Sequence, residues 1–356
     1  MSKKQQAIAG GIGAVILLIV GFLVFGGGGD DEPIVAATTT TTEETTTTTT
    51  EPPRTTSALT GLPVEQEVLD APVVAVKIDN VDGKSTPQVG ITAADVVYEI
   101  QVEGSVTRLL SLFQSTDAAP IGPVRSARGS EIGVLEELNN PLFTWHGENG
   151  ILGPMVRAAK VQARSINEIS GLFYREGGRP APYNSFVQGS AQIRETADEG
   201  STGPVEPIFT FAAEGESPSP LATPASSVHV QFSGGAGGAP VDYAWDGTVW
   251  KRSQKGHPHV DADGNQVAVE NVIVRFVQGI DSGTRDKAGS VVPTAQVIGE
   301  GEVWVLSQGT VTKGTWKKAD GVSVTQYLDA DGNPIKLTPG KTWISMPYTA
   351  AGSSVG

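Results

Sequence analysis

The stretch ADVVYEIQVEGSVTRLLSLFQSTDAAPIGPVRSAR, residues 94–128, decides the fold of this chain. Residues 96–102 and 106–114 are rich in β-branched and aromatic side chains, and Gly104 lies between the two runs. Such runs around a short glycine-containing turn predict a β-hairpin, because glycine readily adopts the positive φ that tight hairpin turns require. We therefore expect two antiparallel strands joined near Gly104.

Alternation along the first strand separates its apolar side chains from its acidic ones. Glu99 and Glu103 fall on one face, opposite the face of the apolar residues. Depending on the turn, Arg108 lies opposite Gln101 or opposite Glu99, and either register puts it on the acidic face. Two carboxylates with an arginine are consistent with an acid–base site, but we favour a solvent-exposed salt-bridge ladder, because exposed ion pairs are common.

Two arginines follow the hairpin in the sequence IGPVRSAR, residues 121–128. Ser126 or Ser130 is a suitable N-cap for the short apolar helical pattern that comes next, so Arg125 and Arg128 lie at a helix start. Cations at that end oppose the helix dipole. Either the two arginines hold an anion there, or each of them pairs with a nearby carboxylate.

Polar residues end two further strand-like runs. One run ends at Asp79 and Asn80, and another ends at His146, which a glycine and Glu148 follow. Polar residues at strand ends before glycines are typical site positions. His146 with Glu148 is therefore a candidate for acid–base chemistry, and the alternative is a hydrogen-bonded structural histidine.

A proline-stiffened loop, residues 179–184, adds one more cation and an amide. It carries Arg179 at its start and Asn184 at its end. We expect these two residues to join the arginines of the 121–128 segment.

The N-terminal region carries the pattern of a membrane anchor. Lys3 and Lys4 precede an uncharged apolar run from residue 7 to residue 25. At ~1.5 Å per residue, this run spans a hydrocarbon core of roughly 30 Å. The lysines place the N-terminus in the cytoplasm and the remaining chain outside. We expect residues 1–29 to form a cytoplasmic tip and a single transmembrane helix, with a cleaved signal peptide as the alternative.

Residues 30–57 are dominated by threonine, with glutamate and proline interspersed. A segment of this composition buries too little apolar surface to fold, which predicts a disordered tether. Threonine-rich stalks that contain proline are also candidates for O-glycosylation.

The composition excludes several classes of function. The formal net charge is −14, which argues against a general nucleic-acid binder, because phosphate binding needs a basic field. The chain has no cysteine, so it has neither disulfides nor a thiol nucleophile. The serine signature S-x-x-K is absent from the sequence, and the pattern G-x-S-x-G occurs once, at residues 352–356, without the strand–turn–helix context that a nucleophile elbow requires.

Two motifs suggest metal ligands at first sight. DADGN occurs at 261–265 and again at 329–333, but the glycine comes two places early for an EF-hand and the twelfth position is not glutamate. Both motifs are therefore interpreted as hairpin turns. His257, His259 and Asp261 alternate along one strand face, so they fit a metal site or, as we favour because of Pro258, an ordinary hairpin arm. We expect no metal and no cofactor.

The organisation behind the tether predicts an α+β protein. Residues 58–204 mix strands with short helices, and residues 205–227 are rich in Pro, Ser and Gly, as in a linker. Residues 228–350 contain recurring strand-like runs without helical periodicity. We therefore expect an N-terminal α/β-mixed domain and a mostly antiparallel β-rich C-terminal domain.

Four segments resemble the YerB-like lipoprotein family of bacteria. They are IDN at 78–80, residues 87–115, IGPVRSAR at 121–128 and RPAPYNSF at 179–186, and the resemblance extends over most of residues 60–349. It implies an extracytoplasmic, membrane-tethered domain and offers no mechanism. The chain departs from the family at its N-terminus, where an apolar run stands in place of a lipobox cysteine.

Two functions from different classes are consistent with these observations. The first is a membrane-anchored binding protein of the cell envelope that holds a wall polymer or an envelope protein through an anionic group. Its predicted ligand-binding residues are Arg108, Arg125, Arg128, Arg179 and Asn184. The second is a cell-wall hydrolase or transferase that uses Glu99 or Glu103 with His146; two carboxylates about 5–10 Å apart in a cleft would favour it.

Overall fold

The computed structural model describes residues 55–103, 106–148, 152–200, 204–232, 240–285, 289 and 291–356. The predicted anchor at 7–25 and the predicted tether up to residue 54 lie outside these ranges. Within them, no helix is long and apolar enough to cross a membrane. Thr56 pairs with Pro63 and Ser57 is buried, so the fold includes residues that the sequence assigned to the tether.

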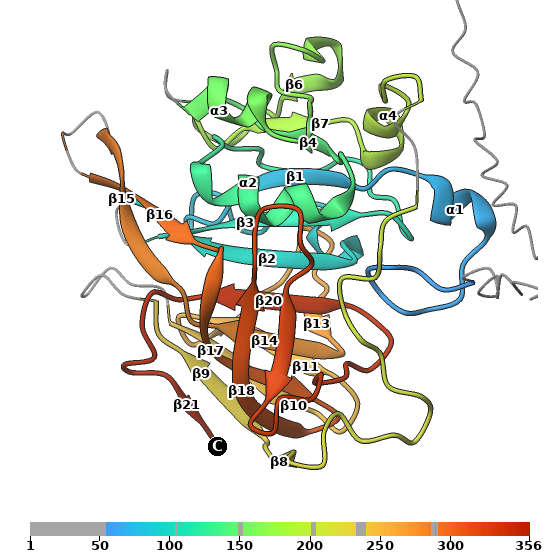
Figure 1. Ribbon diagram of the computed structural model, residues 1–356. Helices are drawn as coiled ribbons and strands as arrows, with labels where there is room; N and C mark the ends of the chain where they lie inside the picture. Colours follow the sequence, from blue (N-terminus) through green and yellow to red (C-terminus); the bar gives the residue numbers. More distant parts are fainter. Residues whose placement is uncertain are drawn as a thin grey trace, which may run out of the picture. The chain divides into compact units, whose positions relative to one another are not determined.

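Most of the described chain is β-sheet, and the helices are few and short (Figure 1). The largest sheet has eleven strands in the order β19-β18-β17-β14-β20-β2-β3-β1-β4-β5, with β8 paired to β18. Its strands are β1 (Val74–Asp79), β2 (Val96–Gln101), β3 (Thr107–Phe113), β4 (Leu142–Thr144), β5 (Gln162–Ala163), β8 (Thr223–Pro224), β14 (Asn271–Arg275), β17 (Gly299–Ser307), β18 (Thr310–Lys318), β19 (Gln326–Asp329) and β20 (Thr342–Met346).

A second sheet of six strands and two separate hairpins complete the β-structure. The six-stranded sheet has the order β12-β11-β10-β9-β21, with β13 paired to β11. Its strands are β9 (Ser227–Val230), β10 (Val241–Trp245), β11 (Trp250–Gln254), β12 (His257–Pro258), β13 (Ala268–Val269) and β21 (Ser354–Val355). The hairpins are β6 (Phe173–Arg175) with β7 (Ser185–Val187), and β15 (Gln278–Arg285) with β16 (Val291–Gln296).

The helical segments lie mainly in the N-terminal half. They are α1 (Gln66–Asp70), α2 (Ile132–Leu135), α3 (Leu152–Ala158) and α4 (Ser190–Arg194), with 3-10 turns η1 (Ile91–Ala93), η3 (Gly129–Glu131), η4 (Glu136–Leu138) and η5 (Ser170–Leu172). The segment η3-α2-η4 confirms the short helical pattern that was predicted after the arginines. The fold is thus mostly sheet with few helices, the coarse form of the α+β prediction.

Strands from both halves of the chain meet in the eleven-stranded sheet. β20 pairs in parallel with β2 of the hairpin and in parallel with β14. All described residues fall within one compact unit, Pro53–Gly356. Hydrogen-bonded strand pairs therefore connect the segments on either side of the predicted linker. The domain boundaries remain a prediction, at 58–204, 205–227 and 228–350.

The predicted hairpin is confirmed, but its register is not the predicted one. Ile100 lies opposite Arg108, and the Val102 N–H donates to the Val106 carbonyl at 2.9 Å. Three residues, 103–105, therefore separate the strands instead of two, and a shift by one residue moves a side chain to the other face. The prediction that Arg108 shares the face of Glu99 is wrong: Arg108 lies on the face of Ile100.

Both faces of the hairpin are buried. Tyr98 and Ile100 belong to a core that includes Leu135 of α2, whereas Val97 and Leu109 pack in a second core against the six-stranded sheet. The alternation of the first strand was thus predicted correctly. The prediction of a solvent-exposed salt-bridge ladder is wrong, because the Glu99 side chain is 0% exposed.

Candidate anion-binding site

Asp79, the last residue of β1, forms the centre of an arginine cluster. Arg108 is its cross-strand partner on β3 and places Nε 3.7 Å from Asp79 Oδ1. Arg125 places Nε 3.3 Å from Asp79 Oδ2. The Asp79 carboxylate is fully buried, yet neither of its oxygens accepts a hydrogen bond among the described groups. Two predicted arginines therefore do converge, on a buried carboxylate whose hydrogen-bonding capacity is unused.

Arg128 is held by Glu103. Its Nε donates to Glu103 Oε2 at 3.0 Å, its Nη2 donates to Oε1 of the same carboxylate, and its Nη1 donates to the Ala127 carbonyl at 2.8 Å. Burial opposes ionisation of Glu103, but the hydrogen bond and charge of Arg128 outweigh it and lower the pKa of Glu103 to about 2. Arg128 is also the N-cap of η3. Of the two alternatives predicted for Arg128, the geometry therefore supports the structural one, in which it forms a bidentate ion pair with a carboxylate.

Arg108 is more deeply enclosed than Arg125 and Arg128. Burial, followed by the neighbouring charge of Arg128, lowers its pKa to about 10, and Glu103 and Asp79 oppose that shift. Its Nη1 donates to the Ser126 carbonyl at 3.2 Å. Arg108 thus supports the loop that carries Arg125 and is largely withdrawn from solvent.

Arg179 fixes one loop to another. Its Nη1 donates to the Ser85 carbonyl at 2.9 Å and its Nη2 to the Pro87 carbonyl at 2.7 Å, while Nε lies 2.8 Å from a Glu176 oxygen. These contacts join the 179–184 loop to the loop of residues 81–87. Arg179 therefore positions neighbouring backbone, a role that its place in a stiff loop did not indicate.

Asn184 orients an arginine that the sequence analysis missed. Its Oδ1 accepts a hydrogen bond from Arg175 Nη1 at 2.7 Å, and Arg175 Nη2 lies 3.5 Å from His146 Nε2. Arg175 is the last residue of β6, opposite Ser185 of β7. The sequence offered one indication that Arg175 is a site residue, namely its position near Asn184 in a hairpin.

Lys84, Arg125, Arg175, His146 and Tyr183 together form a surface that we call the basic rim. Lys84 Nζ lies 5.6 Å and Arg125 Cζ 5.8 Å from the centroid of the Tyr183 ring. The backbone N–H of His146 donates to the Arg125 carbonyl at 3.1 Å. Within the described ranges, no carboxylate pairs with Lys84 or Arg175. The rim is thus locally cationic in a chain whose net charge is −14.

His146 is held neutral at the rim. Burial, followed by the charges of Arg175 and Arg125, lowers its pKa. Its Nδ1 contacts the Ser185 hydroxyl, and its other ring nitrogen faces Arg175. Glu148 is not its partner, because it accepts hydrogen bonds from Trp145 Nε1 and Arg157 Nη1, each at 2.8 Å.

The Ser185–His146 contact has the wrong surroundings for a hydrolytic pair. In a serine hydrolase a carboxylate holds the second ring nitrogen and stabilises the imidazolium that forms. Here an arginine occupies that position, 3.5 Å away. The arrangement disfavours proton uptake by His146 and favours an anion beside it.

Comparisons with known proteins agree with this architecture. Residues 59–202 match the family model "Protein of unknown function (DUF3048) N-terminal domain", and residues 228–344 match the corresponding C-terminal domain. The chain belongs to the DUF3048 family.

Relatives of this DUF3048 chain include "Putative lipoprotein YerB" of Bacillus subtilis (strain 168). The two are 28% identical over 297 residues, which cover 81% of this chain and 85% of YerB. The crystal structure of the YerB protein from Bacillus subtilis superposes with a TM-score of 0.72 at 25% identity, covering 85% of this chain and 100% of that one. The resemblance to the YerB-like family is confirmed.

Glu99 lies between the two DUF3048 domains and is fully paired. Arg252 Nη2 donates to both of its oxygens at 2.9 Å, Thr107 Oγ1 donates at 2.8 Å, and Trp343 Nε1 at 3.0 Å. Glu103 is engaged separately by Arg128. The structure thus gives each of the two carboxylates its own arginine partner, and His146 contacts Arg175 and Ser185 instead of either one.

Further polar side chains extend the Glu99–Arg252 pair into what we call the interdomain network. Asn80 Nδ2 donates to Gln254 Oε1 at 3.0 Å, and Gln88 Nε2 donates to Asn80 Oδ1 at 2.9 Å. His259 Nε2 lies 2.8 Å from Gln88 Oε1, and its Nδ1 faces Arg252 Nη1. Because arginine only donates, His259 Nδ1 accepts and Nε2–H donates to Gln88.

Both DADGN motifs are hairpin turns, as predicted. Asp261 Oδ1 accepts from the N–H groups of Asp263 and Asn265 at 3.0 and 2.8 Å. Asp329 makes the same contacts in the second motif, at 3.0 and 2.9 Å. In the described part of the chain, no three His, Cys, Asp or Glu side chains are grouped as metal ligands.

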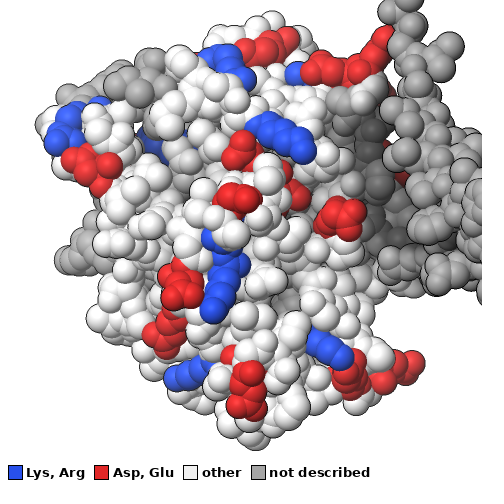
Figure 2. Space-filling model, viewed as in Figure 1, with Lys and Arg blue, Asp and Glu red and all other residues white. Residues whose placement is uncertain are grey.

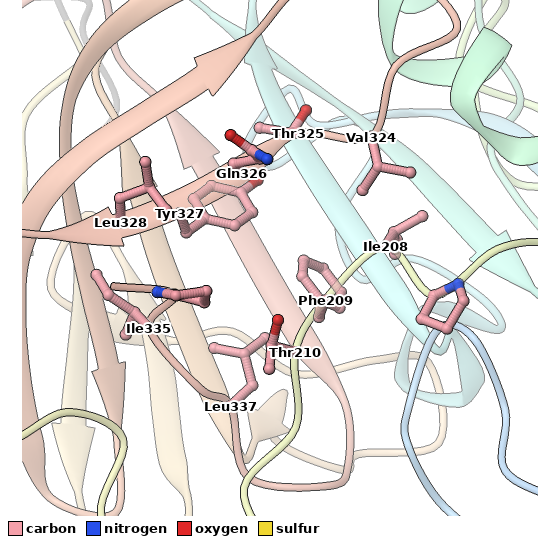
Figure 3. Close-up of a pocket in the computed structure, with 12 residues that line it drawn as sticks. Ile208, Phe209, Thr210, Val324, Thr325, Gln326, Tyr327, Leu328, Ile335 and Leu337 are labelled. Carbon is pink, nitrogen blue, oxygen red and sulfur yellow. The ribbon is translucent and has the colours of Figure 1, made fainter. Parts of the chain in front are cut away.

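A separate pocket in the DUF3048 chain is lined mainly by apolar residues, unlike the basic rim. It has a volume of about 250 Å³ and lies between residues 207–210 and β19 (Figure 3). Among its described lining residues Tyr327 is the one titratable side chain, and burial raises its pKa to about 12. On the face shown in Figure 2, basic and acidic side chains are interspersed. The basic rim is therefore the better candidate site for recognition of a charged ligand.

Proposed function

We propose that this protein is a membrane-anchored, extracytoplasmic protein of the cell envelope that binds an anionic ligand at the basic rim. The observation that carries the proposal is the convergence of Lys84, Arg125 and Arg175 around Tyr183 and a neutral His146. The Asp79 carboxylate is buried beside Arg125, and Glu176, which follows Arg175 in sequence, pairs with Arg179 at 2.8 Å. Charge-assisted hydrogen bonds from guanidinium groups are the usual means of holding carboxylate or phosphate.

Removal of either rim arginine is expected to weaken anion binding about ten- to hundredfold, since a hydrogen bond to a charged group contributes roughly 1.5–3 kcal/mol. Arg125→Ala and Arg175→Ala are compared with wild type by calorimetric titration with inorganic tripolyphosphate. Arg194→Ala is the matched control, because Arg194 already pairs with Asp117 at 2.9 Å. Equal affinities for all three variants would refute the proposal.

Arg128→Ala separates binding from folding. Its guanidinium faces Glu103, so its loss is expected to lower the midpoint of thermal unfolding and to change tripolyphosphate affinity less than Arg175→Ala does. This reverses the expectation from sequence, which treated Arg125 and Arg128 as one pair.

The membrane location rests on the apolar run at residues 7–25 behind Lys3 and Lys4, and on the relative named as a lipoprotein. Protease added to intact, wall-stripped cells is expected to release a soluble fragment that begins in the threonine-rich tract. The fragment is identified by its N-terminal sequence and by mass. Protection of the whole chain from external protease would contradict an extracytoplasmic location.

A further inference from the structure

A small recess is lined in part by the 81–87 loop, which also carries Lys84 of the basic rim. It has a volume of about 150 Å³ and lies between this loop and β12, so the two DUF3048 domains form it together. It is lined by polar and apolar residues together: Asp82, Thr86, Pro87, Gln254, His257, Pro258, His259 and Val260. Pockets between domains are a common location for small ligands.

The floor of this recess is polar and held in one orientation. Gln254 and His259 are 6% and 4% exposed. Gln254 Oε1 accepts from Asn80 Nδ2 and from Arg252 Nη2, each at 3.0 Å, which fixes the amide orientation. Among the described residues, no partner accepts a hydrogen bond from Gln254 Nε2. The amide is therefore positioned to donate to a molecule in the recess.

The mouth of the recess distinguishes a neutral ligand from a second anion. The Asp82 carboxylate and the His257 side chain are exposed there, and the Thr86 hydroxyl is half-buried. Asp82 lies 3.8 Å from Lys255 Nζ, so this pair gives the mouth no excess positive charge to hold an anion. Carboxylate, amide, imidazole and hydroxyl groups together match ligand hydroxyls that both donate and accept. Pro87 supplies an apolar wall. This chemistry fits one ring of a saccharide.

One loop connects the recess to the basic rim. Lys84 extends from residues 81–87 over Tyr183, while Asp82, Thr86 and Pro87 of the same loop face the recess. Arg179 holds this loop through the carbonyls of Ser85 and Pro87. Lys84 of the basic rim and the recess-lining residues of this loop are therefore close in sequence, and the loop holds the two sites at a fixed distance from each other.

We propose that the recess is a saccharide subsite and that the ligand is an acidic glycan, with an anionic group at the basic rim and a neutral sugar in the recess. This inference rests on the proposed anion site. A chain-like ligand that crosses the 81–87 loop uses both sites at once, so its affinity exceeds that of either part alone.

The experiment compares three probes by calorimetric titration of the full chain. Hyaluronan hexasaccharide alternates carboxylate-bearing and neutral sugars, tripolyphosphate supplies anions alone, and maltohexaose supplies neutral sugars alone. His257→Trp fills the recess from an exposed position without adding charge, and His257→Ala removes one polar group. Ala244→Trp introduces the same side chain at an exposed position of β10 and is the control.

His257→Trp is expected to lower the affinity for hyaluronan hexasaccharide about tenfold, with a smaller loss for His257→Ala, and to leave tripolyphosphate binding unchanged. Arg175→Ala is expected to weaken both charged probes. Unchanged hyaluronan affinity in His257→Trp, with both charged probes still weakened by Arg175→Ala, would overturn the saccharide subsite and leave the anion site standing. Failure of wild type to bind either charged probe would overturn both proposals. Maltohexaose is expected to bind more weakly than hyaluronan, and an equal or tighter affinity would contradict the requirement for an anion.

Discussion

Arg252→Met is expected to lower the free energy of unfolding by about 3–5 kcal/mol, because it leaves a buried carboxylate without its cation. The side chains of Arg252 and Glu99 are both 0% exposed, and Arg252 Nη2 donates to both Glu99 oxygens at 2.9 Å. The two residues come from different DUF3048 domains, so the loss is expected to destabilise the whole unit. Urea unfolding measures it as a shift of the midpoint at constant slope.

Lys251→Met is the matched control at the adjacent position of β11. The Lys251 side chain is 47% exposed and lies 3.0 Å from Asp246, so its loss is expected to cost at most about 1 kcal/mol. The double variant Glu99→Gln with Arg252→Met is expected to recover part of the stability lost in Arg252→Met, since the orphaned charge is gone. Equal destabilisation by Arg252→Met and Lys251→Met would contradict the structural role of the interdomain network.

Patterns within a short stretch of sequence were sufficient for several local predictions. The hairpin of β2 and β3, the helical turn around Ile132 and the two DADGN turns each depend on residues close to one another in the chain. Their conformations follow from periodicity, capping and turn chemistry. The hairpin register did not follow, because a two-residue and a three-residue connection are both compatible with Glu103-Gly104-Ser105.

The partner of Glu99 depends on the tertiary fold. Arg252 lies 153 positions away in sequence. It reaches Glu99 only because the six-stranded sheet packs on the face of the hairpin that carries Glu99. A strand with one acidic face reads as half-exposed when it is considered alone. The second sheet buries that face, which changes the expected salt-bridge ladder into a network.

The basic rim was predicted in part. Arg125 and His146 were named from the sequence, but Arg175 and Lys84 were not. Arg128 and Arg179 proved to be engaged by carboxylate and carbonyl groups. All four arginines stand in segments with similar composition. Arg128 makes a bidentate ion pair with Glu103, and Arg179 donates to two backbone carbonyls. Arg125 and Arg175 make neither kind of contact, and this difference depends on loop geometry that sequence patterns do not encode.

Wild-type protein is expected to lose stability as the pH falls below about 6.5, in part because His259 resists protonation when folded. Burial, followed by the charge of Arg252, lowers the pKa of His259 well below its ordinary value. The unfolded chain therefore binds the proton first. The contribution of His259 is fully present above the unfolded pKa and is lost on acidification, by up to about 1.4 kcal/mol per pH unit.

His259→Gln isolates this contribution. Glutamine can accept from Arg252 through Oε1 and donate to Gln88 through Nε2, which reproduces both contacts of the neutral imidazole without a titrating group. Urea unfolding at pH 7 and pH 5 is expected to show a smaller difference for His259→Gln than for wild type. His257→Gln, at an exposed position two residues earlier, is expected to keep the full wild-type difference. If His259→Gln retains the wild-type pH dependence, the acid sensitivity originates in other groups, and the proton-free state of His259 contributes nothing to it.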